Sequence, residues 1–374
     1  MKIIHCSDLH LDSKLSSNLG GIIAKKRCGE ILHTFKRMVD YASKNNISAI
    51  LISGDMFDIY DVTLNTKETV LHAITSNPQI NFYYLKGNHD INTSFLKLVN
   101  VPNNLKMFGS NWRTYEESKG QITISGFELY MHNFDDAYSS LVLDQEKFNI
   151  VMLHGWALDS PPEKKSDIIH LNKLRNKNID YLALGHIHSY RKHKLDGRGI
   201  YCYSGCLEGR GFDECGDCGF VLLDIDETTK KFNSTFVPFA KRKLYQLNVN
   251  LTNCKNTVEM IDRTCSKIQE SKCNKDSMIK IILQGELDVN CIKDVIYLQV
   301  TFDSEFYFTK IVDRTTYKVA NIDIDINEDV GVHAFDRSLK GEFIRQVEND
   351  STLSKEDKAE IIHYGIQALA GEEI

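Results

Sequence analysis

The first part of the chain alternates short apolar runs with longer stretches in which apolar residues recur every three or four positions. The runs at 2–6, 49–52 and 82–85 have the length and composition of buried β-strands. Between them, 28–45 shows helical apolar spacing and 65–75 is a second helix candidate. Strand, helix, strand, helix and strand within about 85 residues predict stacked βαβ units, and hence a mainly parallel sheet.

Further short apolar runs follow this first α/β unit. They predict strands at 105–108, 121–124, 127–131, 149–153 and 181–184, a helix at 166–176, and then strands at 200–204, 220–225 and 232–238 that form a second sheet. Beyond the basic run 241–243, strand, helix and strand patterns at 245–249, 258–268 and 278–282 predict a small α+β unit. From 334 onward we expect a helical tail, with Ser354 as an N-cap and one apolar stripe formed by Ala359, Ile362, Ile366 and Leu369.

Side chains that can bind metal ions follow five of the predicted strands directly. In chain order they are Asp8 and His10, then Asp55, then Asn88 in a turn that continues with His89 and Asp90, then His154, and finally His186 and His188. Parallel sheets collect ligands at their carboxyl edge, so we expect these side chains to meet there. Each piece alone is more often incidental than functional, but five in this order indicate one site.

The donor types of this set narrow its chemistry. Seven nitrogen and oxygen donors suit two divalent ions that share one carboxylate, and the absence of cysteine among them favours manganese, iron or zinc over a soft thiolate site. Manganese is the first candidate. Two such ions stabilise both the attacking and the leaving oxygen of an in-line phosphoryl displacement. The sequence therefore predicts a dimetal enzyme that hydrolyses phosphoesters.

Composition and charge limit which kinds of protein the sequence can represent. A chain of 374 residues with 42% apolar and 26% charged residues is ordinary globular material for two or three domains. The net charge of −6 argues against a uniformly basic nucleic-acid binder, although 25–27 and 191–198 are local basic runs that are either phosphate contacts or solvated faces. No run approaches the ~20 apolar residues of a membrane span, so we expect a cytoplasmic protein without membrane contact.

The ten cysteines are expected to be reduced thiols, because the sequence shows no secretory signal. Cys202, Cys206, Cys215 and Cys218 form the one local cluster, and its last pair has the Cys-x-x-Cys spacing of zinc ribbons. The first pair begins in the strand-like segment 201–204, which would point its thiols awkwardly for a shared ion. We favour core or surface thiols over a structural zinc site.

The motifs Asp8-x-His10, Gly54-Asp55, Gly87-Asn88-His89-Asp90, His154-Gly155 and Gly185-His186-x-His188 together resemble the signature of the calcineurin-like metallophosphoesterases. Within that superfamily, 7–12, 54–58 and 203–208 resemble the SbcD-type DNA repair exonucleases, the nuclease subunits of complexes with SbcC-type ATPases. The less basic C-terminal part, and Asp58 where some relatives carry a histidine, fit the YhaO-like branch of these nucleases better.

The resemblance implies an α/β fold and a domain plan. A four-layer αββα sandwich would occupy 1–240, a smaller α+β capping domain 241–325, and a helical tail 326–374. It also implies that Asp8, His10, Asp55 and His188 hold one ion, and that Asp55, Asn88, His154 and His186 hold the other. His89 would contact the scissile phosphate or protonate the leaving oxygen, with Asp90 holding its ring.

Three functions are compatible with this sequence. The favoured one is a DNA exonuclease or endonuclease of the SbcD type, acting in DNA repair with an SbcC-like ATPase partner and compatible with a homodimer. The alternative is a phosphodiesterase or phosphatase for a small substrate such as a cyclic nucleotide. A scaffold that has lost catalysis is disfavoured because no ligand of the signature is missing. The tail stripe either docks on the ATPase or packs back on its own domain.

Overall fold

The computed structural model describes residues 1–15, 19–58, 62–90, 95, 101–160, 167–288, 290–318 and 339–354, and the positions 357–358, 361–362 and 364–365 of the tail. The chain divides into two compact units, Met1–Leu244 and Tyr245–Ile374. The first unit carries all the residues predicted to bind metal ions.

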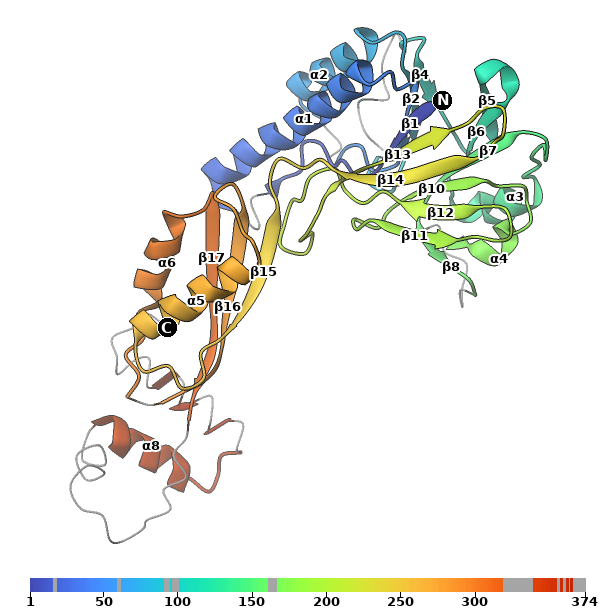
Figure 1. The fold of residues 1–374 in the computed structure, drawn as a ribbon. Coiled ribbons are helices and arrows are strands. Elements are labelled where there is room, and N and C mark those ends of the chain that lie inside the picture. Colours follow the sequence, from blue (N-terminus) through green and yellow to red (C-terminus); the bar gives the residue numbers. More distant parts are fainter. Residues whose placement is uncertain are drawn as a thin grey trace. The chain divides into compact units, whose positions relative to one another are not determined.

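Two six-stranded sheets form the first unit (Figure 1). In the first sheet, β1 (Lys2–Cys6), β2 (Ala49–Ser53), β3 (Asn81–Leu85) and β4 (Leu105–Met107) run parallel, and β13 (Gly219–Ile225) and β14 (Phe232–Pro238) extend the β1 edge antiparallel. The second sheet has the order β11 (Arg191–Lys194), β12 (Ile200–Tyr203), β10 (Tyr181–Gly185), β7 (Phe148–His154), β6 (Ile122–Gly126) and β5 (Arg113–Glu117). A short parallel pair, β8 (Trp156–Leu158) and β9 (Ile168–His170), follows β7.

One apolar core lies between the two sheets and joins them. Leu51 and Leu85 of the first sheet belong to the same buried cluster as Ile150 and Ala183 of the second. Helices cover the outer faces. The ring of Tyr41 in α1 (Gly21–Lys44), which lies beside α2 (Leu64–Thr75), packs 5.5 Å from that of Phe220 in β13.

On the second sheet, α3 (Phe134–Ser139) and α4 (Leu171–Leu174) share a buried cluster with residues of β7 and β10. Helix, sheet, sheet and helix form the predicted four layers, so the α/β sandwich is confirmed.

Three local predictions are wrong, each because tertiary contacts override a local pattern. Residues 200–204, 220–225 and 232–238 do not share a second sheet, since β12 pairs with β10 while β13 pairs with β1. Residues 127–131 are not a strand but an irregular segment followed by a 3-10 turn, Met131–Asn133. The helix expected at 166–176 contains only Leu171–Leu174, because β9 occupies its first part and Asn176 adopts a left-handed backbone with φ 59°.

The second unit contains a three-stranded sheet of order β15 (Leu244–Asn250), β16 (Met278–Leu287) and β17 (Phe308–Tyr317), with helices α5 (Thr257–Glu270) and α6 (Val295–Asp303). The β-branched sequence of α6 did not suggest a helix. Asp294 caps it by accepting a hydrogen bond from the Tyr297 amide at 2.8 Å, and Leu298 and Phe302, one turn apart, are buried.

In the tail, α8 (Leu339–Asn349) contributes Ile344 and Val347 to a small apolar cluster that includes Ile362. Ile362 of the predicted stripe is therefore buried against its own chain. Ala359, Ile366 and Leu369 lie outside the described residues. Within the described part of the chain, no helix has the length and apolar character needed to cross a bilayer.

A buried ionic cluster ties α1 to the segment after β12. Arg27, which has no exposed surface, donates to Glu30 at 2.8 Å and to Glu208 at 3.0 Å, and Glu30 also accepts from Arg242 at 2.8 Å. Burial opposes ionisation of Glu30, but hydrogen bonds from Arg242, Arg27 and Lys241 lower its pKa to about 2. The Glu30 carboxylate therefore stays charged and depends on Arg27 as a partner.

We expect Arg27→Met to lower the free energy of unfolding by about 3–5 kcal/mol, because it leaves buried carboxylates without their cation. Urea denaturation followed by tryptophan fluorescence measures this unit directly, since Trp112 and Trp156 both belong to it. Exposed Lys25→Met is the matched control and should change stability by less than about 0.5 kcal/mol. Equal effects of the two variants would contradict a structural role for the cluster.

Candidate metal centre

The two sheets bring their strand ends together at two glycines. A side chain at Gly185, the last residue of β10, would begin 2.0 Å from the carbonyl oxygen of Ser53 at the end of β2. Gly54 has φ +95°, and a side chain there would collide with the ring of His154. Only glycine allows this approach, which places the ends of β2, β7 and β10 at one point.

The backbone at this point is held in an unusual conformation. Asp8, His10, Asp55 and His186, all predicted ligands, have φ of 52°, 43°, 51° and 100°. The Asp8 amide donates to the Gly54 carbonyl, and the His10 amide donates to the Asp55 carbonyl, both at 3.0 Å. Non-glycine residues with positive φ are costly and concentrate at functional sites, where surrounding bonds enforce them.

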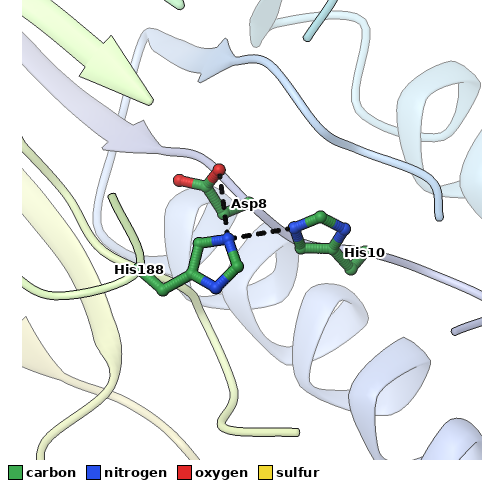
Figure 2. A group of neighbouring side chains, drawn as sticks. All are labelled: Asp8, His10 and His188. Atoms are coloured by element: carbon green, nitrogen blue, oxygen red, sulfur yellow. Dashed lines mark hydrogen bonds and ion pairs between the residues drawn. The ribbon is translucent and has the colours of Figure 1, made fainter. Parts of the chain in front are cut away.

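One group of donors is Asp8, His10 and His188 (Figure 2). The Nε2 atoms of His10 and His188 face each other at 3.3 Å, and His188 Nε2 lies 3.8 Å from an Asp8 carboxylate oxygen. The opposite ring nitrogens are engaged: His10 Nδ1 lies 2.9 Å from Asp58 and His188 Nδ1 lies 2.7 Å from Glu214. Carboxylates that hold Nδ1–H leave the Nε2 lone pairs free for a cation, which is the usual arrangement of metal-binding histidines.

A second group is Asp8, Asp55 and His154. His154 Nδ1 donates to the Ser53 carbonyl at 2.9 Å, so that in the neutral ring Nε2 carries the lone pair. Nε2 lies 3.3 Å from Asp55 and is buried without a well-formed hydrogen bond among the described residues. A buried lone pair beside a carboxylate fits a bound divalent cation.

Charge in the second group is consistent with this reading. Burial would lower the pKa of His154, but the contact with the negatively charged Asp55 carboxylate raises it to about 9. The same contacts hold the pKa of Asp55 below its usual range although burial opposes this. A proton thus occupies the place where a cation fits, and metal binding should release protons.

His186 and Asn88 lie at the edge of these groups. The ring of His186 is 5.4 Å from that of His154, and its backbone amide donates to Asp8 at 2.9 Å. Asn88 and His154 line one pocket. The structure therefore gathers all seven predicted donors in one region of the first unit.

The contact expected between His89 and Asp90 is replaced by another. His89 Nδ1 lies 3.1 Å from Asp58, and this bond raises the pKa of His89 against the effect of burial. Asp90 is fully buried and accepts the backbone amides of Met56, Phe57 and Gly87 at 2.9–3.1 Å. Asp90 thus fixes its own turn onto the loop after β2, and Asp58 orients the rings of both His89 and His10.

Two more side chains belong to the site. Glu214 accepts from His188 and, at 2.8 Å, from Arg210, whose Nη1 lies 3.5 Å from Asp58. Burial opposes ionisation of Glu214, but its bonds to His188 and Arg210 lower its pKa to about 2. Asp58 could have been found from its place three residues after Asp55, whereas no sequence signal marks Glu214 or Arg210.

The cysteine cluster does not assemble as four thiols. Cys206 and Cys218 lie 3.4 Å apart at sulfur, Cys202 is buried in the core between the sheets, and Cys215 is exposed. Among the described residues, no group of three or more potential ligands includes a cysteine.

Comparison with known proteins decides the family. The model for the calcineurin-like phosphoesterases matches residues 1–190, which end just beyond His188. The chain belongs to the calcineurin-like phosphoesterase family. It is accordingly a hydrolase of phosphoester bonds, and the matched residues include all five strands that end in predicted ligands.

Relatives in this family include proteins of DNA repair. The DNA double-strand break repair protein Mre11 of Saccharolobus solfataricus is 24% identical over 100% of this chain and 96% of its own length. The uncharacterized metallophosphoesterase YhaO of Bacillus subtilis is 25% identical over 76% of this chain and 72% of its own. A dimetal phosphatase from Danio rerio, 10% identical, covers 60% of this chain and 92% of its own with a TM-score of 0.39.

Proposed function

We propose that this phosphoesterase is a metal-dependent DNA nuclease of the SbcD type. The observation that carries the proposal is the pair of imidazoles whose Nε2 atoms converge at 3.3 Å beside Asp8 while carboxylates hold their Nδ1 atoms. Asp8, His10, Asp55 and His188 would hold one divalent ion, and Asp55, Asn88, His154 and His186 the other. Two such ions would stabilise both the attacking and the leaving oxygen at the phosphoryl group. Manganese is the first candidate for the metal.

The remaining side chains orient these donors and move a proton. Asp58, Glu214 and the Ser53 carbonyl each hold an Nδ1 atom, which sets the ring orientation of His10, His188 and His154. The His89 side chain is 48% exposed, so it can reach the substrate while Asp58 holds its Nδ1 atom. We assign His89 the donation of a proton to the leaving oxygen.

DNA is the proposed substrate because the repair protein Mre11 aligns with the whole chain rather than with the phosphoesterase region alone. In this proposal the region 241–325 is a cap that guides DNA, and the tail carries the contact to an SbcC-like ATPase. The enzyme acts in the cytoplasm as a monomer or homodimer.

One observation favours the second candidate function, a phosphodiesterase for a small nucleotide. A pocket large enough for a small ligand is lined in part by His154.

The two candidates differ in what the purified protein cleaves. The protein is incubated with Mn²⁺ and, in parallel, with end-labelled linear DNA and bis(p-nitrophenyl) phosphate. We expect it to degrade the DNA and to hydrolyse the small diester, with both activities abolished by a chelator. Hydrolysis of the small diester with intact DNA would replace the nuclease by the small-nucleotide phosphodiesterase.

A further inference from the structure

A pocket of about 380 Å³ opens beside the candidate metal centre. Asn88 and His154, both proposed metal ligands, line it together with Lys86, Gly87, Glu128, Leu129, Tyr130 and Asp167. Its volume is in the range of sites that hold small molecules. A group bound there would be directly adjacent to a phosphate held at the metal centre.

Part of the lining, Glu128, Leu129 and Tyr130, comes from the segment predicted to be a strand and found to be irregular. Glu128, only 4% exposed, forms an ion pair with Lys86 at 3.0 Å and accepts a hydrogen bond from the Tyr130 hydroxyl at 3.0 Å, both at the same carboxylate oxygen. Its backbone amide donates to the Gly109 carbonyl at 2.9 Å, and the Tyr130 amide donates to the Asn133 side chain at 2.7 Å. Lys86 and Tyr130 are therefore fixed before any ligand arrives, which lowers the entropy cost of binding.

The chemistry of the pocket does not suit a second phosphate. Two carboxylates, Glu128 and Asp167, outnumber the single ammonium of Lys86. Tyr130 and Leu129 are half-buried and offer ring and aliphatic surface. Lys86 has three N–H donors and uses one for Glu128, so it can donate to a carbonyl oxygen of the ligand. A flat, neutral group with polar edges meets these conditions.

We propose that this pocket holds the nucleobase next to the scissile phosphate, packed against Tyr130 with its carbonyl edge toward Lys86. The proposal rests on the proposed function, since it places the phosphate of a nucleic acid or nucleotide at the metal centre. A base within a duplex cannot enter such a pocket. The nucleotide beside the cleaved bond must therefore leave its partner strand, so frayed ends and single strands are the preferred substrates.

Three substrates with the same leaving group isolate the contribution of the base. Methyl p-nitrophenyl phosphate carries no base, whereas the thymidine 5′- and 3′-(p-nitrophenyl) phosphates carry one on either side of the phosphate. We expect the wild-type protein with Mn²⁺ to show a lower KM for at least one thymidine ester than for the methyl ester. Tyr130→Ala should raise that KM about 10-fold, as for the loss of one base–aromatic contact, and leave the methyl ester unaffected.

Two variants serve as controls. Tyr130→Phe keeps the ring and should retain the preference for the thymidine ester. Met131→Ala changes an exposed side chain of the same segment that does not line the pocket, and should behave as wild type. Equal KM values for the methyl ester and both thymidine esters in the wild-type protein would overturn the proposal. So would a change in KM by Tyr130→Ala that is equal for the three esters.

A binding measurement decides the case in which no ester is hydrolysed and the proposed function itself fails. Calorimetry with Mn²⁺ compares thymidine 5′-monophosphate with inorganic phosphate. We expect tighter binding of the nucleotide, and an about 10-fold loss of that advantage in Tyr130→Ala. Equal affinities for nucleotide and phosphate would reject the base pocket whatever the catalytic result.

Discussion

Asp55→Asn is expected to reduce bound metal to below one ion per chain and hydrolysis by at least about 10³-fold, the upper range for loss of one group that stabilises a transition state. One Asp55 oxygen lies 3.3 Å from His154 Nε2 and 3.9 Å from His10 Nε2, so the carboxylate touches both donor groups. An amide of the same shape removes the negative charge that both ions would share. Elemental analysis after removal of unbound metal measures the first effect, and diester hydrolysis measures the second.

The matched control for this variant is Asp136→Asn, an exposed carboxylate on α3. It should leave metal content and hydrolysis unchanged. If Asp55→Asn still binds two ions per chain, Asp55 is not the carboxylate that both metals share.

His89→Ala should lower turnover about 10²- to 10⁴-fold while metal content stays at the wild-type value, because a general acid is lost and no ligand is. Asp58→Asn should give a smaller loss of turnover of the same kind, since Asp58 holds His89 Nδ1 at 3.1 Å, together with weaker metal binding through His10. Turnover is measured with a diester whose leaving group is a poor one, such as DNA, because a good leaving group needs little protonation.

His193→Ala is the control, an exposed histidine on β11 of the same unit, and should retain full activity. Loss of bound metal from His89→Ala together with activity would show that His89 is a ligand and not a proton donor.

The fold of the first unit and the donors of the site follow from local patterns. Each donor stands at the end of an apolar run, and the carboxyl ends of parallel strands meet at one edge, so Asp8, Asp55 and His154 could be placed together from the sequence. The left-handed backbone at Asp8, His10 and Asp55 could not be predicted, since it is enforced by bonds between the loops after β1 and β2.

Residues that orient the donors were not predictable in the same way. Glu214 reaches His188 across 26 positions of the chain, and Arg210 reaches Asp58 across 152. Asp90 adjoins His89 in sequence, yet its carboxylate points to the backbone of the preceding loop and Asp58 takes the place beside the ring. Such contacts depend on how loops pack, and no periodic pattern encodes them.

The failed strand at 127–131 has the same origin. A short apolar run suggested a strand, but Phe127 is buried in the core under the second sheet. The Tyr130 hydroxyl donates to the Glu128 carboxylate and the Asn133 side-chain amide donates to the Glu128 carbonyl, and these bonds shape the backbone around the pocket. Local rules often fail at functional sites, where the chain is shaped for a ligand.

Anomalous diffraction from a crystal grown with Mn²⁺ tests the central claim most directly. The proposed site predicts two peaks per chain, one bonded to the Nε2 atoms of His10 and His188 and the other to Nε2 of His154, with Asp55 bonded to both. A single peak, or peaks that lie away from these histidines, would contradict it.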